Sequence, residues 1–351
     1  MSLKPGWLTW ILAAVLVLVA VGISKLVPSP TQSAGVEDPY LNTEMNFSTE
    51  PDAASLAGKE VVRVGIYILS VGNLDLTTGT YTLDFFLNFK CETVPCDPSN
   101  FDLINAAAEP FIEDQTAQDE YGREFYYRVR SDLQTQLDLR DFPFDSHQLK
   151  VSFEDKLKNS DEYVFIVDPS LSGIDSSVLV SGWDLLPKLS AESEDHSYKV
   201  YDESFSRARF YLEIAHPWFS AFMKSIFAAI VIVGVGMLSF LMSYKDAQDR
   251  IGLTSATLAS AIFYHLTLTS SVPPVGYLTY GDQFMILQYV FITAALATAV
   301  ALFLLVSQEN RGERSEQLAQ KIDTWTRHVI PPLWVVSMIV LQLVYIGIPK
   351  F

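Results

Sequence analysis

The chain of 351 residues is long enough for two or three domains, and 49% of its residues are hydrophobic. Its net charge of −17 is unevenly divided, because residues 36–215 hold 34 acidic and 14 basic residues whereas the remainder holds 7 and 10. A strongly acidic domain repels nucleic acids, so we expect no nucleic-acid partner, and it can concentrate cations. The same surplus is also typical of an ordinary solvated surface.

The N-terminus carries an apolar stretch, Trp7–Ser24. A stretch of this kind is either a cleaved secretory signal or a retained membrane anchor. Its length and its two tryptophans favour a retained helix. Under both alternatives, residues 1–30 send the next domain out of the cytoplasm. Residues 31–58 are rich in Ser, Thr, Pro, Asp and Glu, and they are predicted to be a linker.

Residues 59–215 have the pattern of an all-β domain. Segments rich in Val, Ile, Tyr, Phe and Thr recur at short intervals, and Asn100–Ala108 alone has a weak helical pattern. This spacing predicts a β-sandwich or barrel. The strand candidates are Val61–Leu69, Thr80–Lys90, Phe125–Leu137, Gln148–Phe153, Val178–Leu186, Tyr198–Tyr201 and Arg207–Ile214.

The two cysteines, Cys91 and Cys96, flank a turn-like segment and are candidates for a small disulfide in an oxidising compartment. The sequence carries no catalytic or nucleotide-binding motif, and its histidines are dispersed. We therefore predict that the chain is not an enzyme and needs no cofactor. Its acidic clusters are suited to Ca²⁺ as a modulator, since this ion takes carboxylate oxygens.

Residues 216–351 carry four stretches of the length that crosses a bilayer, about 20 residues. The connection Ser307–His328 has four Lys or Arg residues, whereas Pro273–Gln283 has none. The positive-inside rule therefore predicts a multi-pass protein of the cell (inner) membrane with the β-domain outside. The architecture is an all-β extracellular sandwich followed by a four-helix transmembrane bundle, with an extra N-terminal apolar helix. The stretches are Pro217–Met242, Ile251–Val272, Phe284–Val306 and Val329–Pro349.

The second of these, Ile251–Val272, is too polar to face lipid on all sides. Six of its residues recur at steps of four and three, so they share one face. If several copies surround an axis, Phe263 and Leu266 would form a hydrophobic constriction that gates by dewetting, and His265 would face neighbouring helices. Packing of helices through small residues accounts for this face equally well. The face consists of Gly252, Ala256, Ala259, Phe263, Leu266 and Ser270.

Asp249 stands just before this helix. Repeated by symmetry, it would form an acidic ring that selects cations. A carboxylate also suits the N-terminus of any helix, and the two roles are compatible.

The segment Leu137–Leu149, LDLRDFPFDSHQL, resembles the Phe-Pro-Phe-Asp loop of the pentameric ligand-gated ion channels in their prokaryotic form. Asp249-Arg250-Ile251 resembles the start of their pore helix, and the likeness extends from about Val61 to Ile348. Animal members flank the first loop with a disulfide, which Thr135 and Leu149 cannot form. Further matches lie in the loop after the pore helix, at Pro274, Tyr277, Thr279, Tyr280 and Asp282.

This resemblance implies a homopentamer in the lipid bilayer, in which an agonist bound between neighbouring sandwiches opens a pore lined by helix 251–272. A small-molecule amine, Ca²⁺ or a proton is the expected agonist. The residues implied in coupling are Phe142, Pro143, Phe144, Asp145, Pro273, Pro274 and Tyr277. Those implied in ligand binding are Glu109, Phe153, Tyr198, Tyr201 and Phe205.

Several positions depart from the family's pattern. Cys91 replaces a usual Trp, and Ala215 or His216 replaces a usual Arg before the first pore-domain helix. Ala259 stands where many relatives have a bulky gate residue, so we expect the gate higher, at Phe263 and Leu266. The alternative function is a membrane-anchored extracellular binding or adhesion module without a pore, although such a module would not need the polar helix.

Overall fold

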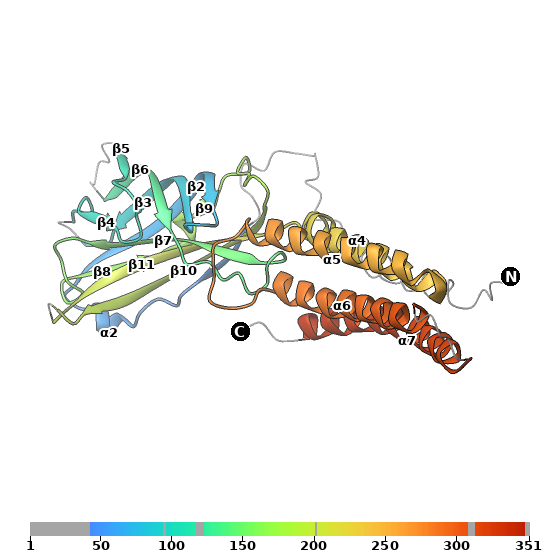
Figure 1. The fold of residues 1–351 in the computed structure, drawn as a ribbon. Helices are drawn as coiled ribbons and strands as arrows, with labels where there is room; N and C mark the ends of the chain where they lie inside the picture. The colour runs from blue at the N-terminus through green and yellow to red at the C-terminus, as the bar shows by residue number, and fades with distance from the viewer. Residues whose placement is uncertain (1–42, 94–95, 117–122, 201, 308–312, 348–351) are drawn as a thin grey trace. The chain divides into compact units, whose positions relative to one another are not determined.

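The computed structural model describes residues 43–93, 96–116, 123–200, 202–307 and 313–347 (Figure 1). The apolar helix expected within residues 1–30 lies outside this part of the chain, and so does Tyr201. The described chain forms two compact units. The sheet unit comprises residues 43–138 and 145–217, and the helical unit comprises residues 139–144 and 218–347.

The sheet unit consists of two β-sheets, which confirms the prediction of an all-β sandwich. One sheet has the strand order β1-β10-β11-β7-β4, and the other has the order β5-β6-β3-β2-β8, with β9 beside β2 (Figure 1). The strands are β1 (Glu44–Phe47), β2 (Glu60–Asp75), β3 (Thr80–Cys91), β4 (Phe101–Leu103), β5 (Phe111–Asp114), β6 (Glu124–Gln134), β7 (Ser146–Asp155), β8 (Tyr163–Val167), β9 (Gly173–Ile174), β10 (Asp184–Tyr198) and β11 (Glu203–Ala215).

Alternating side chains of both sheets form the core of the sandwich. In β3, for example, Leu83, Phe85, Leu87 and Phe89 all point into it and are buried. Burial of each such side chain contributes roughly 1.5–3 kcal/mol to folding. The period of two that predicted a strand here is the period that fills the core.

The structure corrects two local predictions. The supposed linker 31–58 contains β1 and the short helix α2 (Ala53–Leu56). Strand β1 pairs in parallel with β10, and Phe47 packs edge-on against Phe210 at 6.1 Å, so burial of apolar side chains orders a segment of polar composition. Asn100–Ala108 forms β4 and a turn instead of a helix.

Cys91 and Cys96 are joined by a disulfide bond at the end of β3. Their Cα atoms lie 6.2 Å apart, within the range that disulfides span. Cys91 is also buried in the sandwich core. The bond therefore fixes the loop that leaves β3 to the core.

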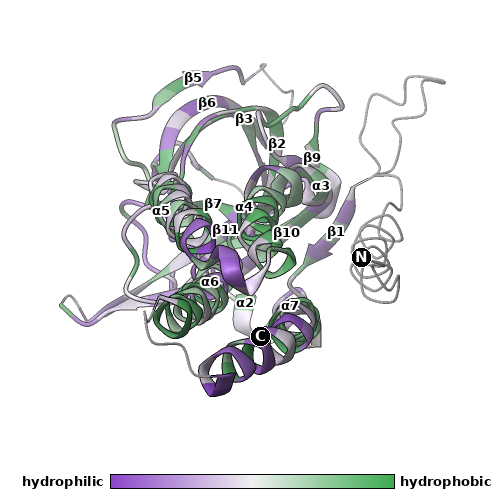
Figure 2. Ribbon diagram, turned by 45° about the vertical axis from the view of Figure 1, so that its right-hand side comes forward, coloured by the Kyte–Doolittle hydropathy of each residue, from purple (hydrophilic) through white to green (hydrophobic). Residues whose placement is uncertain are grey.

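The helical unit contains four helices that are long and apolar enough to cross a membrane, which confirms the prediction of a multi-pass arrangement. The first combines α3 (Trp218–Ala221), a π-helical turn (Phe222–Ile226) and α4 (Phe227–Met237). The others are α5 (Ala247–Thr269), α6 (Tyr280–Val306) and α7 (Glu313–Gly347). Figure 2 shows that hydrophobic residues dominate α6, whereas α7 carries residues of both kinds.

Two details decide how these helices pack. A Cβ atom at Gly236 of α4 would lie only 2.8 Å from Thr257 of α5, so glycine permits the close approach of the two helices. Helix α7 begins at Glu313, well before the predicted Val329. Its first turns are polar, but one apolar side chain in them packs against other helices. Ala319 is buried there with Ala247 and Leu302.

Candidate functional site

Helix α5 has a buried face and an exposed face. The buried face packs within the helical unit, and a threonine hydroxyl there donates to the helix backbone, as Thr257 Oγ1 does to the Leu253 carbonyl at 2.9 Å. Such bonds satisfy polar side chains inside a membrane protein, so polarity alone does not require water beside them. The buried residues are Ala247, Arg250, Thr254, Thr257, Ala261 and Leu268.

The exposed face of α5 is the face that the sequence predicted to line a pore. Phe263 and Leu266 are its bulky members, with 69% and 61% of their surfaces exposed. The described residues of the chain cover none of this face, which in a membrane must meet lipid, another protein or a water-filled path. All seven residues predicted for the pore are exposed, namely Asp249, Gly252, Ala256, Ala259, Phe263, Leu266 and Ser270.

The two charges at the start of α5 point in different directions. Asp249 is exposed, whereas Arg250 is buried and lies 2.7 Å from Asp323 of α7. Arg250 also donates to the Met242 carbonyl at 2.7 Å, and Asp323 pairs with Arg327 at 3.0 Å. This network secures the start of α5 to α7, and it leaves Asp249 as the charge directed away from the bundle.

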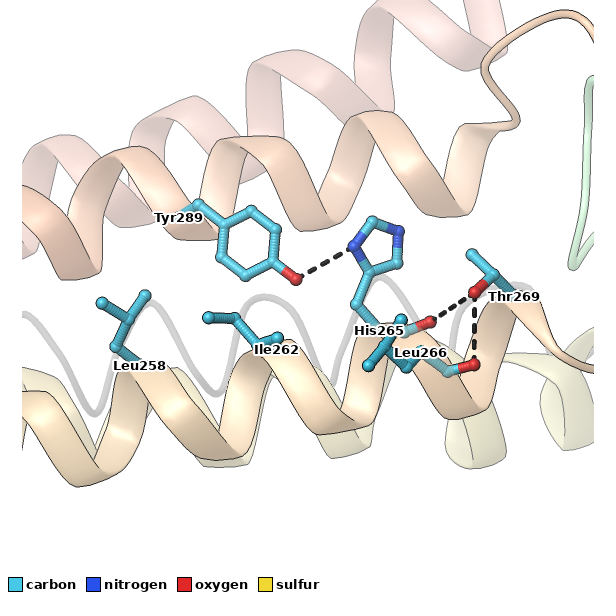
Figure 3. Close-up of a pocket in the computed structure, with 6 residues that line it drawn as sticks. All are labelled: Leu258, Ile262, His265, Leu266, Thr269 and Tyr289. Carbon is cyan, nitrogen blue, oxygen red and sulfur yellow. Dashed lines mark hydrogen bonds between the residues drawn. The ribbon is translucent and has the colours of Figure 1, made fainter.

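His265 lies against α6, as the helix geometry predicted. Its Nδ1 atom is 2.9 Å from the Tyr289 hydroxyl (Figure 3). Its Nε2 atom is 3.0 Å from Asp282. Beside it, a cavity of about 370 Å³ lies between α5 and α6. The lining residues are Leu258, Ile262, His265, Leu266, Thr269 and Tyr289.

The segment Leu139–Phe144, between β6 and β7, belongs to the helical unit. The Tyr280 and Gly281 amides donate to the Arg140 and Phe142 carbonyls at 2.8 and 2.9 Å. The Leu139 amide donates to the Tyr277 hydroxyl at 2.9 Å. These bonds hold the segment at the N-terminal end of α6.

Aromatic contacts strengthen this attachment. The Phe144 ring lies 6.1 Å from Trp218 of α3, 5.6 Å from Tyr280 and 6.4 Å from Tyr345 of α7. Phe142 is buried, and the Phe142–Pro143 peptide bond is cis. Residues 142–144 and Tyr277, all expected to take part in coupling, therefore come together in the helical unit. Pro273 and Pro274 lie in the loop between α5 and α6.

Asp145, the fourth residue of the motif, lies in the sheet unit. Its buried carboxylate is bonded to two imidazoles, those of His147 and His216. Burial alone would raise the pKa of Asp145, but the hydrogen bonds and charges of the two histidines outweigh it and lower this pKa to about 2. The sequence motif identified the carboxylate but could not identify its pairing with His216, which is 71 residues away.

The expected ligand-binding residues lie in different environments. Tyr198 of β10 donates to Glu154 of β7 at 2.9 Å and accepts from Arg207 of β11 at 2.9 Å. Burial, and then the hydrogen bond to Glu154, raise the pKa of Tyr198. Phe205 packs edge-on against Tyr198 at 5.8 Å.

Phe153 and Glu109 do not join this group. Phe153 is fully buried in the sandwich core and stacks on Phe210, so its ring presents no surface to a ligand. Glu109 is exposed in the loop before β5. Among the described residues, no group of three or more His, Cys, Asp or Glu side chains is arranged to hold a metal ion.

Comparison with known proteins gives relatives but no matching protein-family model. The chain is 23% identical over 312 residues to a proton-gated ion channel of Gloeobacter violaceus, across 82% of this chain and 83% of that protein. It is 24% identical over 197 residues to ligand-gated ion channel 50 of Caenorhabditis elegans, across 56% of this chain but only 38% of that protein. These relatives are ion channels and not enzymes. They confirm the resemblance that the sequence motifs indicated.

Proposed function

Because the chain is a homologue of ligand-gated ion channels, we propose that five copies of it surround one cation-conducting pore lined by α5. The main support is the exposed face of α5, which the sequence selected by its spacing and which the helical unit leaves uncovered. A ring of five such faces around an axis would enclose a path for ions. A binding module without a pore would not need an uncovered face of this kind.

The proposed gate lies at Phe263 and Leu266. Toward the start of α5, the same face carries Gly252, Ala256 and Ala259, whose side chains are too small to close a wide ring. Apolar rings of Phe and Leu side chains expel water from a narrow pore, which stops ion flow without filling the pore sterically.

Cation selectivity follows from charge. The exposed Asp249 side chains of five subunits would form an acidic ring at one mouth of the pore. The sheet unit adds a large surplus of carboxylates, which raises the local concentration of cations. The basic residues of Ser307–His328 favour a cytoplasmic location for that mouth and an extracytoplasmic sandwich in the cell membrane.

We favour the proton as the agonist. One relative, which matches 82% of this chain, is a proton-gated ion channel. The aromatic group at Tyr198 is the alternative site for a cationic amine. Any of these ligands would open the pore only by binding the open state more tightly.

The direct experiment is current recording from the purified full chain in planar bilayers, with native mass measurement in mild detergent. We expect a pentamer and a cation current that appears as the outer solution is acidified. A monomer or dimer in several detergents, or the absence of current with protons, amines and Ca²⁺ alike, would reject the proposal in favour of a module without a pore.

A further inference from the structure

Asp145 and two histidines form a compact buried group in the sheet unit. The Asp145 carboxylate binds His147 Nε2 through Oδ2 at 2.5 Å and His216 Nδ1 through Oδ1 at 2.8 Å. The Asp145, His147 and His216 side chains are 1%, 2% and 20% exposed. The His216 amide also donates to the Asp145 carbonyl at 3.1 Å, so backbone and side chain fix the same pair.

Trp183 covers both imidazoles. Its ring stacks on His216 with centroids 3.7 Å apart, and it lies 5.3 Å from the His147 ring. A protonated imidazole interacts favourably with the face of an indole, which suits this site to a cationic histidine. Trp183 also gives the site an optical reporter.

The neighbouring charged residues Glu213 and Asp184 are themselves acidic, so they do not neutralise Asp145. On β11, Glu213 is bonded to Gln148 of β7 and to Lys188 of β10. Asp184 of β10 pairs in register with Ala215. The charges that lower the pKa of Asp145 are those of the two histidines. The carboxylate therefore stays ionised in mild acid, where histidine is the side chain that ordinarily changes charge.

The position in the chain gives this group its mechanical importance. Asp145 directly follows Leu139–Phe144, the segment that belongs to the helical unit. His216 is two residues before Trp218, where the chain enters the helical unit again. The bonds between Asp145 and His216 thus join the two strands through which the chain passes between its units.

We propose that Asp145, His147 and His216 form a proton-binding site in which protonation tightens the attachment of the end of β11 to the start of β7. A proton from water adds to the second ring nitrogen of a histidine, Nδ1 of His147 or Nε2 of His216, and no other bond forms or breaks. The hydrogen bond, which until then carries charge only at the Asp145 carboxylate, then joins two opposite charges and becomes stronger. The first proton also cancels the buried negative charge, so the three groups take up protons as one unit.

Proton uptake at this site does not depend on the proposed channel function, but its link to opening rests on proton gating. Two arms of one experiment separate them. The first follows Trp183 fluorescence against pH in the full chain, with Trp183→Phe to identify its contribution, because protonated imidazole quenches a stacked indole. The second records currents against pH from the same variants.

Two substitutions at His216 test the site in opposite directions. His216→Phe keeps a ring on Trp183 but cannot take up a proton, whereas His216→Arg carries a permanent charge. For His216→Phe we expect loss of most of the Trp183 titration. We also expect the proton concentration at half-activation to increase about tenfold or more, since the free energy of a hydrogen bond to a charged group is at least that of a tenfold change in an equilibrium. His216→Arg should conduct at neutral pH.

His196→Phe is the matched control, because His196 is a partly exposed histidine of β10 in the same unit. It should leave both titrations unchanged. An unaltered Trp183 titration in His216→Phe would overturn the proposed proton site. A lost titration with an unaltered pH dependence of current would overturn its role in opening. A lost titration in a protein without any proton-evoked current would support the site while rejecting proton gating.

Discussion

Replacement of Asp323 by asparagine should destabilise the helical unit strongly. The Asp323 carboxylate lies 2.7 Å from Arg250 and 3.0 Å from Arg327. Both guanidinium groups also donate to the Met242 carbonyl, at 2.7 and 3.0 Å. Asparagine keeps the shape of the side chain but leaves the buried Arg250 without its counter-ion. Removal of one partner of a buried ion pair costs about 3–5 kcal/mol, and we expect a loss of this size in the free energy of unfolding.

The assay is unfolding of the full chain in mixed micelles titrated with sodium dodecyl sulfate and followed by helical circular dichroism. Glu316→Gln is the control, because Glu316 and Lys245 are 3.8 Å apart and their side chains are 50% and 62% exposed. Breaking such a surface pair should cost at most about 1 kcal/mol. The reasoning is refuted if Asp323→Asn costs no more than the control. The double variant Arg250→Met with Asp323→Leu should recover part of the loss, because apolar residues often replace a buried pair without net cost.

Three further predictions concern pH, the gate and selectivity. Asp145→Asn should cost at most about 2–3 kcal/mol, since the hydrogen bonds and charges of His147 and His216 lower the pKa of Asp145 to about 2 in the folded protein against about 3.9 unfolded. This stabilisation is present above the unfolded pKa and disappears as pH falls through about 2, so stability curves of the variant and wild type should converge in strong acid; a constant gap would contradict it. Phe263→Ala and Leu266→Ala should raise resting single-channel conductance, because a wider and less apolar ring wets more easily; an effect of only the control Ala259→Ser would locate the constriction deeper. Asp249→Lys should move the reversal potential in asymmetric salt toward that of chloride, and unchanged selectivity would end the acidic-ring proposal.

Local periodicity explains what the sequence could predict. The period of two in β3 and the steps of three and four in α5 depend only on neighbouring residues, and the structure places the first set in the core and the second set on one exposed face. The polarity of α5 was harder to interpret. Thr254 and Thr257 donate to carbonyls of their own helix, so part of its polar composition belongs to the buried face.

Contacts between distant residues could not be predicted in this way. Arg250 meets Asp323 across 73 positions, and Asp145 meets His216 across 71. In each case a charged residue is buried only because its partner is present, and no local pattern identifies that partner. Strand β1 was missed for a similar reason, since its apolar residues find their contacts on β10 and β11.

The most direct test of the central claim, a pore lined by α5, is modification of a single introduced cysteine during current recording. The native cysteines are joined in a disulfide and should not react. Ala256→Cys lies on the exposed face of α5 and Ala261→Cys on its buried face. We predict that a cationic thiol reagent added to the open channel irreversibly reduces the current of Ala256→Cys and leaves that of Ala261→Cys unchanged. Reduction of the Ala261→Cys current with an unaffected Ala256→Cys would contradict the proposed pore.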